Sequence, residues 1–130
     1  MGKYSKSKLQ EKYSDWHWQF LEPQTYLSDI DGFWVETRKG RGLVAVYDLK
    51  EPNAEITMTE KIVMDWFFGK LPFYIFWVDE DLKDFKVLKY YKDCLEKQED
   101  ENGHIYFEPL KEEDVKIMSE WEFVEFLQKL

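Results

Sequence analysis

The chain has 130 residues, of which 44% are hydrophobic and 35% are charged, and its formal net charge is −9. This length suits a single domain over residues 1–130 with a packed core. The acidity argues against a basic protein that coats nucleic acid without specificity. The single cysteine, Cys94, excludes an intrachain disulfide and a multi-cysteine zinc or iron–sulfur site. No stretch reaches the roughly 18 apolar residues of a membrane span, so no membrane association is expected.

The first half of the chain predicts a helix and then a β-hairpin. The helix, over residues 7–21, has apolar residues at spacings of four, three and four: Leu9, Tyr13, Trp16 and Phe20. Residues 30–37 and 43–50 are rich in β-branched and aromatic side chains, so both are predicted strands. The second strand is apolar until Asp48, which indicates a central strand that is buried on both faces.

The second half predicts a further helix and two or three more strands. Thr57 followed by Glu60 is a capping box, so a helix is expected over residues 57–68, with Gly69 at its end. The core face of this helix is expected to contain Ile62, Val63, Trp66 and Phe67. Residues 71–78 and 84–91 are predicted strands, the second of them half exposed, and residues 103–110 a short edge strand.

Two further features complete the chain. The acidic residues 96–101 are expected to form an exposed loop. A C-terminal helix is predicted to begin near Lys111 and to bury Val115, Met118, Trp121, Phe123, Val124 and Leu127. Strands that alternate with helices predict an α/β fold in which a mixed β-sheet is flanked by helices, with an extra helix at the C-terminus.

Two charged side chains stand at the end of the apolar strand 43–50. Asp48 and Lys50 are two residues apart, so they point to the same face of the strand. One interpretation is a surface pair at the strand end. The other is that Asp48 is a metal ligand and Lys50 orients or activates a water molecule, because a buried charge is costly unless it is paired or binds a metal.

Asp31 bears on this choice because it begins the preceding strand. In a hairpin, the start of the first strand lies beside the end of the second, so Asp31 would approach Asp48. Two adjacent carboxylates repel unless a cation lies between them, and oxygen ligands of this kind suit Mg²⁺ or Mn²⁺. Two carboxylates and a lysine can hold a metal, activate water and stabilise the charge that develops in phosphodiester cleavage. Asp29 is an alternative to Asp31, since strand alternation places both on one face.

This pattern resembles the D…(D/E)xK signature of the PD-(D/E)XK, or restriction-endonuclease-like, superfamily, and its small viral and resolvase-like members in particular. The order of predicted elements over roughly residues 5–90 resembles the α-β-β-β-α-β core of these nucleases, one strand short unless a third strand lies near residues 51–56. The resemblance implies that Asp31 and Asp48 are metal ligands, that Lys50 is the catalytic lysine, and that Glu11 is the carboxylate supplied by the first helix. Glu60 lies near the place of a helix glutamine found in some members, and is also explained as a capping residue.

The resemblance therefore implies a Mg²⁺- or Mn²⁺-dependent nuclease that hydrolyses DNA phosphodiester bonds. Arg38, Lys39 and Arg41, in the turn of the hairpin, are the expected contacts to DNA phosphates, unless they are simply solvated. Cutting both strands would need a second copy, so a homodimer is plausible. An intracellular, cytoplasmic location is expected, in a host cell if the protein is viral. The competing hypotheses are an acidic binding protein without catalysis, such as an inhibitor or immunity-type module, and a nuclease fold that has lost its activity.

Overall fold

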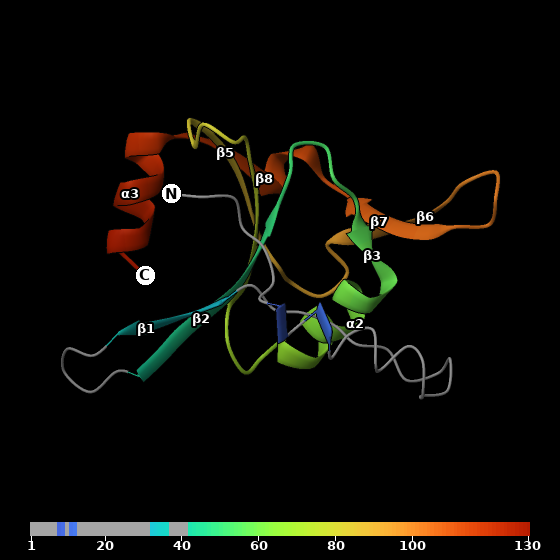
Figure 1. Cartoon of the computed structure of the whole chain (residues 1–130), viewed down its shortest axis with the longest axis horizontal. Helices are drawn as coiled ribbons and strands as arrows, with labels where there is room; N and C mark the ends of the chain where they lie inside the picture. The colour runs from blue at the N-terminus through green and yellow to red at the C-terminus, as the bar shows by residue number, and fades with distance from the viewer. Residues whose placement is uncertain (1–7, 10, 13–31, 37–41) are drawn as a thin grey trace.

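The computed structural model describes residues 8, 9, 11, 12, 32–36 and 42–130. Its elements follow the chain as β1 (Gly32–Glu36), β2 (Gly42–Lys50), β3 (Ile56–Thr57), α2 (Met58–Phe67), β4 (Phe73–Val78), β5 (Asp84–Lys89), β6 (Leu95–Glu99), β7 (Ile105–Pro109), the 3₁₀ turn η2 (Glu112–Asp114), β8 (Val115–Ser119) and α3 (Glu120–Gln128) (Figure 1). Residues 8, 9, 11 and 12 are helical, and the rest of the helix predicted over residues 7–21 lies outside the described residues.

Five strands form a mixed sheet in the order β1-β2-β4-β5-β8. β1 and β2 pair antiparallel, as the predicted hairpin requires, and β2 pairs in parallel with β4. The remaining pairs, β4 with β5 and β5 with β8, are antiparallel. The fold is therefore mixed α/β, and β2 lies inside the sheet, as its apolar sequence predicts.

Helix α2 makes the connection between the parallel strands β2 and β4. Its first turn is fixed by the predicted capping box: the Thr57 hydroxyl accepts from the Glu60 backbone N–H, and the Glu60 carboxylate accepts from the Thr57 backbone N–H. Such a box satisfies two of the backbone donors that every helix start leaves without an intrahelical partner. The box thus fixes where α2 begins, with its N-cap Thr57 seven residues after Lys50, the last residue of β2.

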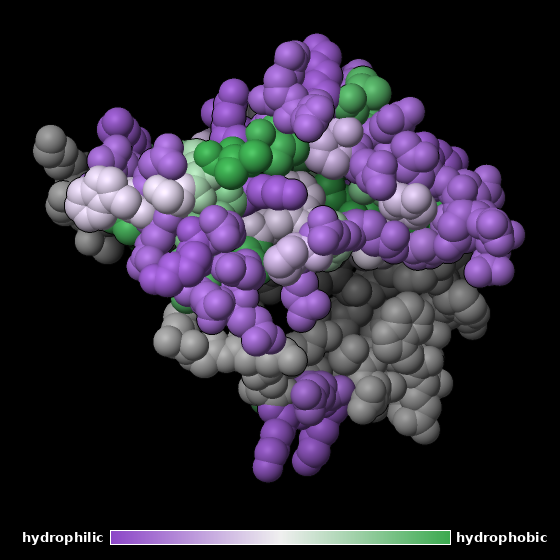
Figure 2. Space-filling view, turned by 90° about the horizontal axis from the view of Figure 1, so that it is seen from above, coloured by the Kyte–Doolittle hydropathy of each residue, from purple (hydrophilic) through white to green (hydrophobic). Residues whose placement is uncertain are grey.

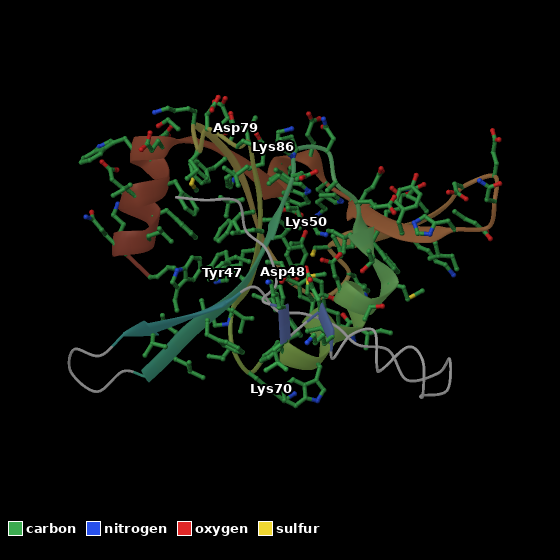
Figure 3. All side chains as sticks on the ribbon, viewed as in Figure 1. Tyr47, Asp48, Lys50, Lys70, Asp79 and Lys86 are labelled. Atoms are coloured by element: carbon green, nitrogen blue, oxygen red, sulfur yellow. The ribbon has the colours of Figure 1, made fainter. Side chains whose placement is uncertain are left out.

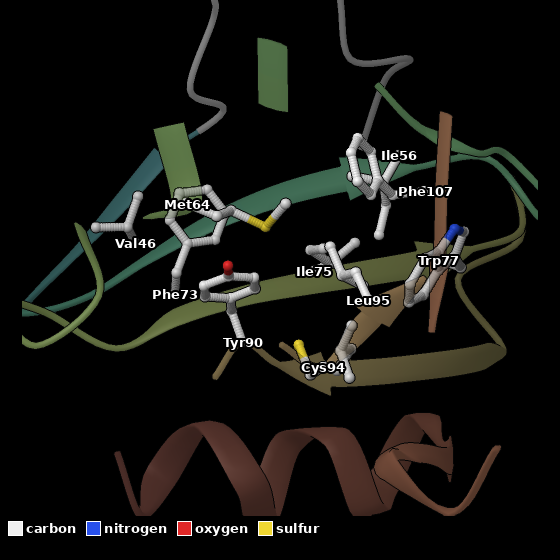
Figure 4. Close-up of a cluster of buried hydrophobic side chains, with 11 residues drawn as sticks. Val46, Ile56, Met64, Phe73, Ile75, Trp77, Tyr90, Cys94, Leu95 and Phe107 are labelled. Carbon is white, nitrogen blue, oxygen red and sulfur yellow. The ribbon is translucent and has the colours of Figure 1, made fainter. Parts of the chain in front are cut away.

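The two faces of the large sheet carry separate hydrophobic cores. On one face Met64 of α2 joins Val46, Phe73 and Ile75 of the sheet in one core cluster (Figure 4). On the other face α3 packs through Phe123 and Phe126 against a second cluster. Figure 1 shows the resulting three layers, with α3 on one side of the sheet and α2 with β3, β6 and β7 on the other.

A second, three-stranded sheet has the order β3-β7-β6 and was not expected from the sequence. The prediction that residues 96–101 form a loop is wrong, because Leu95–Glu99 is strand β6. Exposed charged residues can form a strand where an adjacent strand supplies the backbone partners, here β7. β7 is the middle strand of this sheet rather than an edge. β3 pairs with β7, so it does not supply a third strand to the large sheet.

The C-terminal prediction is wrong in its first part. Instead of one helix from Lys111, the chain forms η2, then strand β8 at the edge of the large sheet, and then α3 from Glu120. A second capping box begins α3, with Ser119 and Glu122 in the places that Thr57 and Glu60 occupy in α2. Trp121 is 68% exposed and does not belong to the buried side.

The buried side of α2 also differs from the prediction. Met64 is the buried residue of the helix, and Val63 and Phe67 pack beside it. Ile62 and Trp66, which were expected in the core, are 58% and 62% exposed. No helix in the described part of the chain is long and apolar enough to cross a bilayer.

Candidate active site

The polar end of β2 lies on the face of the large sheet that α2 covers. Side chains alternate along a strand, so Asp48 and Lys50 share the face of Val46, which belongs to the core beneath α2. Asp48 is only 5% exposed and is the buried charged residue among the described core positions. Figure 3 labels both residues along β2, toward α2. The structure therefore places a carboxylate and an ammonium group at the rim of a hydrophobic core, as the sequence pattern predicts.

Lys50 is held by the first turn of α2. Its Nζ donates to Oε1 of Glu60 at 2.7 Å, and the two side chains are 10% and 19% exposed. The same Oε1 accepts from the Thr57 backbone N–H at 2.8 Å. Glu60 is thus both a capping residue and the ion-pair partner of Lys50. The capping role is one of the two explanations of Glu60 that the sequence offers, the other being the place of a helix glutamine found in some nucleases. The contact with Lys50 is not predicted from the sequence.

The register of the hairpin bears on the predicted partner of Asp48. Gly32 is opposite Tyr47, and Phe33 is opposite Val46. In the sequence, Asp31 precedes Gly32 and Asp48 follows Tyr47. Asp31 itself lies outside the described residues, and so do the alternative ligand Asp29 and the loop cations Arg38, Lys39 and Arg41.

Gly32 is required by the packing of this hairpin. A Cβ atom at this position would lie 2.5 Å from the Tyr47 Oη and 2.6 Å from its Cζ, which is far inside van der Waals contact. The Tyr47 ring is stacked on Trp34 with centroids 4.6 Å apart, so it cannot move aside without losing that contact. The glycine therefore lets the Tyr47 ring lie across β1, and Tyr47 directly precedes Asp48, the predicted metal ligand, in the sequence.

The other predicted site residue within the described ranges is Glu11. It is helical and exposed. In the part of the chain that the structure describes, no three His, Cys, Asp or Glu side chains gather into a group that could hold a metal. The predicted pair includes Asp31, which is outside that part. The role of Glu11 as an additional carboxylate therefore stays a prediction.

A groove of about 800 Å³ lies on the same face of the sheet, beyond Lys50. The register places Lys50, Trp77 and Lys86 side by side on three adjacent strands, and the last two line the groove. The indole N–H of Trp77 donates to the Ala54 carbonyl at 2.8 Å, which fixes the loop after β2. Four carboxylates also line the groove, from Glu55, Asp100, Glu108 and Glu112.

This groove is not predicted from the sequence, since its residues come from six separate segments of the chain. Its charge decides what it can accept. Four carboxylates against the ammonium group of Lys86 repel a phosphate backbone. A nucleic acid that reached Asp48 and Lys50 would therefore avoid the groove.

Two titratable residues in the described part of the chain stand apart from this site. A hydrogen bond to Glu55 raises the pKa of His104 above its ordinary value, and the pair joins the β6–β7 hairpin to the loop before β3. Burial raises the pKa of the Cys94 thiol, which opposes formation of the reactive thiolate. Neither residue has a part in the proposed site.

Comparison with protein-family models, with curated proteins and with solved structures finds no match for this chain.

Proposed function

We propose that the protein is a metal-dependent nuclease that hydrolyses DNA phosphodiester bonds. The observation that carries the proposal is the buried carboxylate of Asp48, on an interior strand and two residues before a lysine whose ammonium group is fixed in place. Such an arrangement places a carboxylate and an ammonium group at the rim of the core, on one face of one strand, where they could act on the same bound ion and substrate. The order of hairpin, helix and parallel strand from β1 to β4 supports the proposal, although among the described residues the third strand of a restriction-endonuclease-like core is missing, because β3 pairs with β7 in the second sheet.

The donor chemistry of the site fits Mg²⁺ or Mn²⁺. Asp48 offers hard carboxylate oxygens from a rigid strand, and we propose Asp31 as the second ligand across the hairpin and Glu11 as an additional carboxylate. When bound, such an ion lowers the pKa of its water and offsets charge on the phosphate. Asp48 would hold the ion, and its burial would exclude competing water. The ammonium group of Lys50, on the same face, would orient the attacking water and stabilise charge on the scissile phosphate.

The basic hairpin turn is proposed as the contact to the DNA backbone. Arg38, Lys39 and Arg41 follow β1 in the sequence, while the acidic groove lies beyond the opposite end of β2. Phosphate contacts position a duplex without reading its sequence. A substrate held by this turn would run toward Asp48 along the hairpin, and a homodimer would present two such sites to the two strands.

The test is cleavage of plasmid DNA and of a labelled oligonucleotide with and without Mg²⁺ or Mn²⁺. Wild type is expected to cut only with the metal. Asp48→Asn and Lys50→Met are expected to lose at least about a hundredfold in rate, roughly 2.7 kcal/mol of barrier. Lys83→Met is the matched control, because Lys83 pairs with Glu120 on the exposed surface and has no role in the proposed site. Wild-type cleavage that persists in chelator, or in Asp48→Asn, would reject the proposal.

The acidic groove favours a second candidate function, which is non-catalytic binding of a basic partner. A nuclease fold that has lost its activity could also have this function. In Figure 2 most of the side chains drawn in colour are hydrophilic, with smaller groups of hydrophobic ones between them. The net charge of −9 agrees with such a role. Absence of any metal-dependent cleavage by folded wild type would favour this candidate.

A further inference from the structure

The carboxylate of Glu60 joins two parts of the site that are distant in sequence. Its Oε1 accepts from the Lys50 ammonium at 2.7 Å and from the Thr57 backbone N–H at 2.8 Å. One oxygen atom therefore connects the end of β2 to the first turn of α2. Because β2 is hydrogen-bonded on both sides and α2 is held by its core face, this oxygen has little freedom to move.

We propose that Glu60 is the positioning residue of the site, which sets the place of the Lys50 ammonium group beside Asp48. The inference rests on the proposed nuclease function and deepens it. A lysine side chain has four rotatable bonds, and an unrestrained ammonium group would sample many positions. The ion pair selects one of them before substrate arrives, so the cost of ordering Lys50 is met during folding.

The second capping box of the chain separates this role from helix capping. In α3 the Glu122 carboxylate accepts from the Ser119 backbone N–H at 3.0 Å, as Glu60 does from Thr57. Glutamine at this position also completes a capping box. Glu60→Gln therefore keeps the cap and removes the charge that holds Lys50, whereas Glu122→Gln makes the same change where no site is proposed.

The experiment measures kcat and KM for Mg²⁺-dependent cleavage of a DNA oligonucleotide. Glu60→Gln is expected to lower kcat about tenfold and to leave KM within about twofold. In a Lys50→Met background the same substitution should have no further effect, because Glu60 acts only through Lys50. Glu122→Gln should match wild type. A loss in Glu60→Gln that multiplies with that of Lys50→Met, or no loss at all, overturns the inference.

A second measurement needs no cleavage and separates failure of this inference from failure of the nuclease proposal. Acetic anhydride labels amines, and mass spectrometry of the peptide that contains Lys50 gives its labelling rate. Release of the ammonium group in Glu60→Gln should raise this rate at least about threefold, with no change in Glu122→Gln. An unchanged rate overturns the inference. A raised rate together with inactive wild type shows that Glu60 positions Lys50 but that the proposed nuclease function is wrong.

Discussion

The ion pair between Lys50 and Glu60 should be measurable as a coupling free energy in unfolding. The perturbations are Lys50→Met, which keeps the length and apolar stem of the side chain, and Glu60→Gln, which keeps the capping box. Each single variant leaves one charged group without its partner in a partly buried place, and the double variant removes both charges. The four proteins form a double-mutant cycle that isolates the pair.

The geometry sets the expected magnitude. Unit charges at the observed 2.7 Å attract by about 6 kcal/mol at an effective dielectric constant near 20, and by about 1.5 kcal/mol in bulk water. Desolvation of both groups offsets most of the first figure. The Lys50 and Glu60 side chains are 10% and 19% exposed, so their pair is intermediate between a surface ion pair and a buried one. Surface ion pairs contribute about 0–1 kcal/mol to stability, and removing one partner of a buried pair costs about 3–5 kcal/mol. We expect a coupling of about 1–2 kcal/mol.

Urea unfolding followed by tryptophan fluorescence gives the four free energies. Replacing Glu122 with Gln in wild type and in Lys50→Met gives a control cycle, which should be additive within about 0.3–0.5 kcal/mol. A coupling between Lys50 and Glu60 no larger than that of the control would refute the account of the ion pair. The slope of free energy on urea should be the same in all variants, since none changes the area buried on folding.

Three further predictions follow from other parts of the molecule. Glu55 raises the pKa of His104, so this pair stabilises the fold fully below the unfolded pKa of about 6.5, and the stabilisation is lost as pH rises through the folded pKa. The melting temperature of wild type should therefore exceed that of His104→Gln at about pH 6 and equal it near pH 9. A difference that does not change with pH would contradict this. Gly32→Ala should cost about 1–3 kcal/mol in urea unfolding, because the Tyr47 ring occupies the place of the new methyl group, and an unchanged free energy would refute that packing. Replacing the three cations of residues 38–41 with Ser should reduce the slope of log affinity for duplex DNA on log salt by about 2.7, and an unchanged slope would assign them to solvent.

The central part of the fold could be predicted because its signals are local. The apolar run that ends at Asp48 gave β2, the capping box at Thr57 gave the start of α2, and the uninterrupted apolar run after Leu71 gave β4. Each of these patterns specifies backbone conformation without reference to distant residues. The same reasoning placed Asp48 and Lys50 on one face, and the structure agrees.

The elements that are not predicted from the sequence form through contacts with distant strands, although local patterns mark some of their ends. β8 forms because the edge of β5 is available to residues 115–119, which is a tertiary effect. Its end could have been found, since Ser119 and Glu122 repeat the capping-box pattern. The turn of the β6–β7 hairpin contains Asn102-Gly103, with Gly103 at φ +78°, and that dipeptide is a strong hairpin signal.

In the candidate site, the carboxylate and the lysine could be predicted, but the partner of the lysine could not. Glu60 is ten residues from Lys50, and its contact with Lys50 depends on how α2 packs against the sheet. The acidic groove is likewise formed where the second sheet packs against the large one, and local patterns predict the β6–β7 hairpin at most, not where it packs. Positions that are set by packing between elements lie beyond what periodicity and capping can specify.

The central claim is that the end of β2 is a divalent-metal site, and thermal unfolding in Mn²⁺ tests it most directly. A ligand that binds only the folded state stabilises it by about 2.7 kcal/mol at a hundredfold excess over its dissociation constant. Millimolar Mn²⁺ should therefore raise the melting temperature of wild type by several degrees. Asp48→Asn should show a much smaller rise, and Asp65→Asn, which changes an exposed carboxylate on α2, should behave as wild type. Equal rises in wild type and Asp48→Asn, or no rise in either, would contradict the claim.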